Sequence, residues 1–313
     1  MKILDVLSTG LRRVNSSKRY IFVVYGVNLL LALVLGGALA VSLAGSIGNS
    51  VAGEKLLQSF DELWYPNFAA QAKGVARTFD PSVVGIGAVF NGLDTLLQGN
   101  FFDTSPAVAG VGLFYLLLWT FFSAGFVSLY AAGSERPSFL HQAAHFFPRF
   151  LILGLMAGVL YFLLFKFVLG WLTKAVDELT RETIDERVHF TYTVLKYLIL
   201  WFGILSVNIL LDYSKIFTVL KNHKNAFTAP LGAMKVVFGN FLKTYGLYMT
   251  LGLLWVALLS VCWLIAPGAG QSSWLMIFAA FLVGQLYVLS RIWTRCLFYA
   301  GQTTLCSALT ASE

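Results

Sequence analysis

Six segments of the chain are long and apolar enough to cross a bilayer as helices. The hydrocarbon core of a bilayer is about 30 Å thick, so a crossing helix needs roughly 20 residues with few charges. The six segments are residues 20–47, 107–132, 150–172, 188–211, 244–266 and 271–290. Only 12% of the residues are charged, whereas a soluble domain has about 25%. The sequence therefore predicts an all-α integral membrane bundle of six transmembrane helices.

Basic residues are divided unequally between the two sides that six crossings define. One side receives the leader 1–19, the loops before the third and fifth spans and the C-terminus, with fourteen basic and four acidic residues. The other side receives six basic and eleven acidic residues. Because positively charged loops resist translocation, we expect both termini on the cytoplasmic side, an N-in/C-in orientation. The first run of 28 residues is longer than a signal-peptide core of about 7 to 15, so we expect it to remain as an anchor.

Two segments beside the spans have the pattern of amphipathic helices that lie in the membrane interface. In 136–149 the apolar face continues to Phe150 and the opposite face is polar; these faces hold Phe139, Ala143, Phe146 and Phe150, and His141, His145 and Arg149. In 226–243 the apolar face holds Phe227, Leu231, Met234, Phe238 and Phe241, opposite Lys235, Gly239 and Lys243. Each segment follows an outward-to-inward span, which favours a parallel internal duplication. The leader 1–19 has a similar stripe of Ile3, Leu4, Leu7 and Leu11.

The predicted outer side carries one long insertion, 48–106. Apolar residues at helical spacing in 56–64, and Asp80 with Pro81 as a cap and first turn, predict two or three short amphipathic helices on the outer leaflet. The segment 82–98 is apolar enough to dip into the bilayer, but a seventh full crossing would place the basic stretch 215–243 outside. The insertion is interpreted either as a packing cap or as a lid or partner platform.

The stretch LLDYSKIFTVLKNHKN, residues 210–225, raises a choice between an ion-binding acid and a helix that leaves the membrane. If the fourth helix continues past the bilayer, Asp212 and Lys215 face water at a spacing that lets them pair. Acids that work in transport usually lie deeper and face a cavity, so we interpret Asp212 as an exposed pairing residue. Asn222 to Asn225 are predicted to end this helix, and Thr228 with Pro230 to begin the next.

Signals for catalysis or cofactor binding are absent from the sequence. His141 and His145 have the four-residue spacing of metal ligands, but no nearby Glu or Cys completes a site. Cys262, Cys296 and Cys306 lack metal-type spacing and are read as buried thiols. No phosphate-binding glycine loop, nucleophile elbow or HExxH motif occurs. The sequence predicts no catalytic residues, no metal and no cofactor.

Polar and basic residues near the spans are the remaining candidates for function. Asn28, Asn208 and Gln285 are candidates to line a path, although such groups commonly form hydrogen bonds between helices. A set of basic residues falls at one predicted depth on the inner side, where it would contact lipid headgroups or act as an interface anchor. This set is Arg149, Lys243, Arg291 and Arg295. Small residues, including Gly154 with Gly158 and the series from Gly36 to Ala44, predict close helix packing.

Four stretches carry a resemblance to known proteins. They are RRVNSSKRY, SVAGEKLLQSFDELW, the basic RPSF segment and LLDYSKIFTVLKNHKNAF. Their arrangement resembles a group of uncharacterised bacterial polytopic membrane proteins, which implies a place in the bacterial inner membrane. In layout alone the chain also resembles the membrane domains attached to some glycerophosphodiester phosphodiesterases. The catalytic carboxylates and histidines of those enzymes belong to a separate soluble domain without a counterpart in these residues, so the resemblance implies no activity.

These observations predict a non-enzymatic membrane protein, a scaffold or accessory subunit that binds lipid, a membrane protein partner or a second copy of itself. The net charge of +7 suits anionic lipid headgroups, and no nucleic-acid partner is expected. The alternative is a transporter or lipid-handling permease with a path between two parallel helix repeats. A polar cavity near Asn28, Asn208 or Gln285 would favour that alternative.

Overall fold

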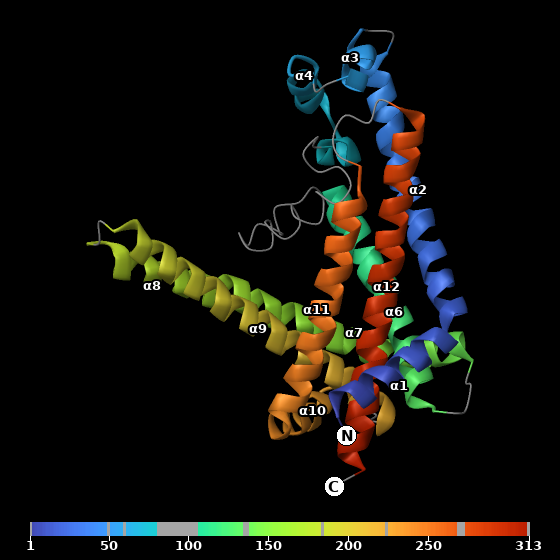
Figure 1. Cartoon of the computed structure of the whole chain (residues 1–313), viewed down its shortest axis with the longest axis vertical. Coiled ribbons are helices and arrows are strands. Elements are labelled where there is room, and N and C mark those ends of the chain that lie inside the picture. The colour runs from blue at the N-terminus through green and yellow to red at the C-terminus, as the bar shows by residue number, and fades with distance from the viewer. Residues whose placement is uncertain are drawn as a thin grey trace. The chain divides into compact units, whose positions relative to one another are not determined.

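The computed structural model describes residues 2–48, 51–58, 61–79, 106–133, 138–182, 185–222, 225–267 and 273–311. Within these ranges the secondary structure is helical and contains no strand (Figure 1). Six helices are long and apolar enough to cross a membrane: Lys18–Ile47, Gly110–Ala131, Phe139–Thr180, Glu186–Leu220, Phe241–Ile265 and Trp274–Thr310. The predicted all-α class with six candidate spans is confirmed.

The chain divides into two compact units, which are described separately. Unit 1 consists of Met1–Ser16, Leu117–Leu251 and Cys296–Glu313, and unit 2 consists of Ser17–Leu116 and Gly252–Arg295. Three helices have parts in both units: α6 (Pro106–Ala131), α11 (Phe241–Ile265) and α12 (Trp274–Thr310). All three continue without a break through the division.

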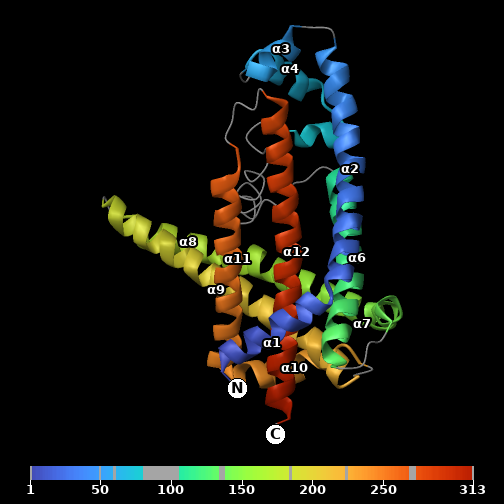
Figure 2. The same cartoon turned by 45° about the vertical axis from the view of Figure 1, so that its right-hand side comes forward.

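A long antiparallel helical hairpin forms one part of unit 1. Its first arm is α7 (Phe139–Leu163), a π-helical turn η4 (Leu164–Val168) and α8 (Leu169–Thr180), and its second arm is α9 (Glu186–Leu220). The arms lie side by side in both views (Figures 1 and 2). Near the charged tip of the hairpin, His189 Nδ1 lies 3.1 Å from Thr180 Oγ1. At the π-helical turn Gly203 admits Leu164, because a Cβ at Gly203 would lie 2.9 Å from Leu164 Cδ1.

The first arm differs from the predicted division into an interfacial helix 136–149 and a span beginning at residue 150. The helix runs unbroken through Pro148. One buried stripe crosses the predicted boundary without a change of phase, and it holds Phe139, Ala143, Phe146, Phe150 and Leu153. A stripe at helical spacing favours one continuous helix, and packing of this stripe offsets the hydrogen bond that the proline removes. Phe139 packs against Phe126 of α6 (Pro106–Ala131), with ring centroids 5.1 Å apart.

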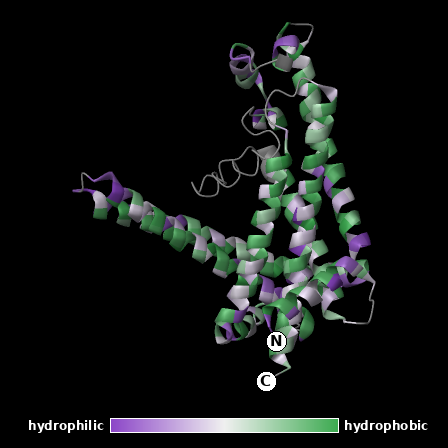
Figure 3. Cartoon of the chain, viewed as in Figure 1, coloured by the Kyte–Doolittle hydropathy of each residue, from purple (hydrophilic) through white to green (hydrophobic). Residues whose placement is uncertain are grey.

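The core of unit 1 is concentrated near the two termini of the chain. Every residue from Cys296 to Cys306 in α12 is buried, and in α9 the buried residues lie between Leu200 and Thr218. The part of α9 before Leu200, by contrast, has no buried residue. The two arms of the hairpin are mostly apolar along their length and polar at the hairpin tip (Figure 3). The helix α9 has 35 residues and is therefore about 52 Å long, so it exceeds the hydrocarbon thickness.

The N-terminal helix α1 (Ile3–Ser16) packs across the last part of α12. A Cβ at Gly10 would lie 3.3 Å from the backbone nitrogen of Gly301, so the two backbones are in near contact. Arg13 Nη1 donates a hydrogen bond of 2.9 Å to the carbonyl oxygen of Tyr130 in α6. Burial lowers the pKa of the Arg13 guanidinium below its ordinary value.

The stripe of Ile3, Leu4, Leu7 and Leu11, predicted for an interfacial helix, lies beside the fully buried face of α1 and remains a prediction. The buried residues are Val6, Gly10 and Val14, and Leu4 is exposed. Gly10 decides which face packs, because its lack of a side chain permits the close approach to Gly301.

The helix α9 ends and α10 (Ala229–Gly239) begins as the sequence predicts. Asn222 follows the last turn of α9 with a φ of +44°, which is the left-handed conformation that ends many helices. Thr228 is the N-cap of α10, and Pro230 lies in its first turn. Asn240 separates α10 from α11.

Unit 2 contains α2 (Lys18–Ile47) and three short helices of the insertion: α3 (Ala52–Gln58), α4 (Trp64–Gln71) and the 3₁₀-helix η1 (Gly74–Thr78). Phe79 ties α4 to the end of η1, because its ring lies 5.7 Å from that of Phe68 and its carbonyl oxygen accepts a 3.3 Å hydrogen bond from Tyr65. The helix predicted from Asp80 to Leu97, including the 82–98 segment, lies outside the described residues.

The glycines that the sequence singled out for close packing have no close neighbour in the described part of the chain. A Cβ at Gly154, Gly158 or Gly36 would meet no atom within 4 Å among the described residues. Close approaches occur at other glycines, each opposite a backbone or a large side chain: Gly10, Gly53, Gly125, Gly203, Gly232 and Gly246. Because the surrounding solvent is apolar, a small-residue face within a span does not by itself require a protein neighbour.

Candidate functional site

Asp212 is buried, although the sequence predicted that it faces water. Its side chain is 1% exposed, and Lys215 Nζ lies 4.0 Å from its Oδ1. The predicted pairing is therefore confirmed, whereas the predicted exposure is wrong. The reason is that α9 continues beyond residue 211 under cover of other helices. The next residues, Tyr213 and Ile216 among them, are also buried.

Two helices of unit 1 supply this cover. Gly232 of α10 lies against Phe217 of α9, since a Cβ there would be 2.5 Å from Phe217 Cε1. From α12, Cys306 is close enough to Tyr213 to interact with it electrostatically. Helical spacing places Gln302 and Thr303 on the same side of α12 as Cys306. We call these five buried residues the α9–α12 polar seam: Asp212, Tyr213, Gln302, Thr303 and Cys306.

Part of the hydrogen-bonding capacity of the α9–α12 polar seam is not used by the residues that the structure describes. Tyr213 Oη, Thr303 Oγ1 and both polar atoms of the Gln302 amide are buried without a hydrogen-bond partner among the described residues. Leaving a buried polar group unpaired costs about 1 to 3 kcal/mol. Residues 302–306 were missed by the sequence prediction, which ended the last span at 290. An uncharged run from Cys296 to Ser312 is the signal that indicates burial there.

We expect the substitution Gln302→Met to stabilise the protein. Methionine has a similar length and removes two buried polar atoms that make no hydrogen bond within the described structure. The expected gain in the free energy of unfolding is about 1 kcal/mol or more, measured as a rise in the thermal unfolding midpoint of the purified protein in nanodiscs. A clear fall in the midpoint would contradict the view that this amide makes no essential interaction. Thr304→Val is the control, because Thr304 Oγ1 donates a 2.8 Å hydrogen bond to the carbonyl oxygen of Ala300.

The three residues predicted to line a path form hydrogen bonds within their own units. Asn28 and Asn208 donate to carbonyl oxygens one turn earlier in their own helices, those of Val24 at 2.7 Å and Ile204 at 3.1 Å. Gln285 Oε1 accepts a 2.9 Å hydrogen bond from the Tyr25 hydroxyl. Asn208 belongs to unit 1, and Asn28 and Gln285 belong to unit 2. The described structure thus uses all three in local hydrogen bonds.

The four basic residues predicted at one depth differ in their surroundings. Arg149 Nη1 donates a 3.0 Å hydrogen bond to Asn222 Oδ1, and its guanidinium lies 5.2 Å from the centre of the Phe146 ring. Arg149 thereby joins the start of the first hairpin arm to the end of the second. Lys243 is exposed in unit 1, whereas Arg291 and Arg295 belong to unit 2.

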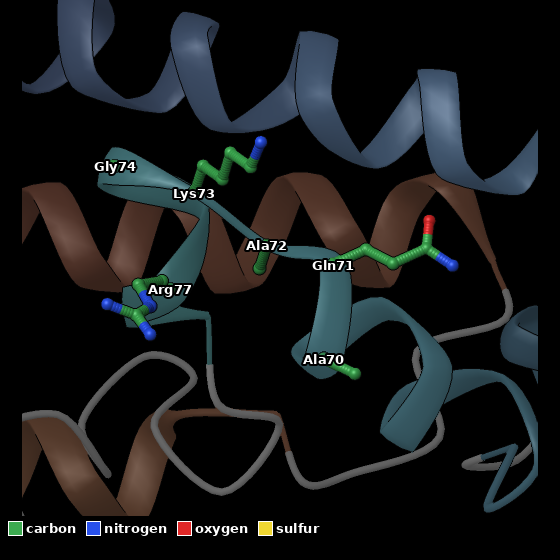
Figure 4. A pocket seen from close by; sticks show the side chains of 6 residues that line it. All are labelled: Ala70, Gln71, Ala72, Lys73, Gly74 and Arg77. Carbon is green, nitrogen blue, oxygen red and sulfur yellow. The ribbon is translucent and has the colours of Figure 1, made fainter.

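A surface cavity of about 590 Å³ lies beside the short helices of unit 2. Its lining includes Gln71, Lys73 and Arg77. Their side chains point in different directions, and the lysine and arginine do not converge on a common point (Figure 4). His141 and His145 are exposed, and within the described residues no group of three or more His, Cys, Asp or Glu could hold a metal ion.

Comparisons with known proteins found no match: no family model, no curated protein and no solved structure is similar to the chain. The resemblance to bacterial polytopic proteins therefore gains no support from them. Function is accordingly inferred from the chain's own residues.

Proposed function

We propose that this protein is a non-enzymatic membrane scaffold or accessory subunit that binds lipid, a membrane protein partner or a second copy of itself. The observation that carries the proposal is the local use of the polar residues in the spans. Asn28 and Asn208 are bonded to their own helices, and Gln285 to Tyr25. A transport path needs polar groups that face a cavity, and these three side chains are engaged elsewhere.

The core near the termini also supports a scaffold. Buried side chains of α1, α6, α7, α9, α10 and α12 gather in unit 1, and a packed core of this kind holds surrounding helices in fixed positions. A scaffold presents such a platform to its partners. A transporter instead needs elements that alternate between two arrangements.

We further propose the N-in/C-in orientation and a bacterial inner-membrane location. The contact of Gly10 in α1 with Gly301 in α12 supports termini on one side, as an even number of crossings requires. The basic residues on that side favour the cytoplasm.

The test is reconstitution of the full chain into sealed vesicles, followed by measurement of ion leakage and of the exchange of fluorescent lipids between leaflets. We expect both rates to equal those of protein-free vesicles. A flux above that level that disappears in Asn208→Leu would overturn the scaffold and favour the permease. Purification in mild detergent, with identification of the bound lipids and proteins, is expected to recover a defined partner.

A further inference from the structure

The helix α10 has two different apolar faces. Small residues on one face are buried against α9, namely Ala229, Pro230, Ala233, Val236 and Val237. Large residues occupy the opposite face: Phe227, Leu231, Met234 and Phe238, with Phe241 and Leu242 at the start of α11. Leu231 is 68% exposed, Phe238 56% and Leu242 83%. A contiguous exposed apolar surface of this kind marks an interaction site.

Two observations identify the chemistry of the partner. Only Asn240 separates α10 from α11, which is a candidate span, so the exposed face lies beside the start of a membrane-crossing helix. No acidic residue occurs between Tyr213 and Ser312, while lysines follow at 215, 221, 224, 235 and 243. An apolar face bordered only by cations is the pattern of a helix that lies in an anionic leaflet.

We propose that the exposed face of α10 and the first turn of α11 inserts into the acyl region of an anionic leaflet, with Lys235 and Lys243 at the headgroups. Lys235 lies within the exposed arc, between Leu231 and Phe238, and its long stem allows the ammonium to reach the headgroup level. Arg149 is not part of this surface, because it is bonded to Asn222 and stacked on Phe146.

The surface deepens the proposed function, since it names lipid as one partner of the scaffold. The packing of Gly232 on Phe217 holds α10 against α9 and thereby fixes which side of α10 faces outward. Rotation of α10 about its axis would bury Leu231 and expose Ala233, and the tight contact at Gly232 prevents it.

The first test uses photo-crosslinking of the full chain in nanodiscs of phosphatidylcholine with phosphatidylglycerol. A benzoylphenylalanine residue replaces Leu231 or Phe238, and the control position is Glu178, which is exposed at the charged end of α8. We expect lipid adducts, identified by mass, at residues 231 and 238 and few at 178. A protein adduct at 231 or 238, or no adduct there, would overturn the lipid surface. Either result would contradict the lipid surface but not the proposed scaffold function. A flux in the vesicle assay would contradict the scaffold function but not the lipid surface.

The second test examines the headgroup contacts. We expect Lys235→Gln and Lys243→Gln each to lower the preference for phosphatidylglycerol over phosphatidylcholine by about fivefold, measured from lipids retained in native mass spectra. The matched control is Arg149→Gln, which removes an equal charge from a residue that is already bonded. An unchanged preference in both lysine variants, or an equal loss in the arginine variant, would contradict the assignment.

Discussion

Replacing Gly10 with leucine should strongly destabilise the protein, because the new side chain would force α1 away from the last part of α12. The Cβ of any larger residue would lie 3.3 Å from Gly301 N and 3.4 Å from Gly301 Cα. These are backbone atoms of a helix that is buried on all sides from Cys296 to Cys306, so they have no free space into which to move. Overpacking of a core costs about 1 to 3 kcal/mol, and we expect Gly10→Leu to reach the upper end of this range. The measurement is the thermal unfolding midpoint in nanodiscs.

Two glycine controls separate this close contact from a general effect of removing glycine. Gly158→Leu should leave the midpoint nearly unchanged, because a Cβ there meets no atom within 4 Å among the described residues. Gly301→Ala should also be mild, since its Cβ would meet Leu251 and Leu247 at the ordinary distances of 3.6 and 3.8 Å. If Gly10→Leu proved as stable as Gly158→Leu, α1 would not pack on α12 as described.

The second large effect is expected from Lys215→Met. This substitution removes the ammonium group 4.0 Å from Asp212 Oδ1 and leaves a carboxylate that is 1% exposed. Removal of one member of a buried ion pair costs about 3 to 5 kcal/mol, and we expect the low end of this range because Lys215 is 16% exposed. The measurement is again the thermal unfolding midpoint in nanodiscs, compared between Lys215→Met and the unchanged protein.

Asp212→Asn should cost less than Lys215→Met, because the remaining lysine reaches solvent and a neutral amide is less costly to bury than a charge. The double variant Asp212→Asn with Lys215→Met should recover part of the stability lost in the lysine variant. Additive losses in the double variant would show that the two side chains do not interact. An exposed pair, as predicted from the sequence, would instead give changes below about 1 kcal/mol in every variant.

The helical class and its candidate spans were predictable because runs without charge are a local property of the sequence. Helix boundaries at Asn222, Thr228 and Pro230 were predictable for the same reason, since a left-handed residue and an N-terminal proline act within one turn. In both cases the physical cause lies in neighbouring residues.

The burial of helix ends could not be predicted in this way. Charges at Arg291 and Arg295 indicated the end of the last span, yet α12 continues to Thr310. Asp212 was interpreted as exposed because nothing in its own helix shows that this part of α9 is buried. Contact between Gly10 and Gly301 could not be predicted either, because it depends on two segments at opposite ends of the chain. The hydrogen bond of Gln285 depends likewise on Tyr25, a partner far away along the chain that only the fold specifies.

Cys306 offers the most direct measurement of the central claim, that the last part of α12 is the centre of a packed core. We expect N-ethylmaleimide, which crosses membranes, to modify Cys306 only after the protein is denatured, because the thiol is fully buried in the folded state. Ala311→Cys, five residues further along the chain and exposed, should react at once. Rapid modification of Cys306 in the folded protein, at a rate equal to that of the introduced cysteine, would contradict the claim of a packed core.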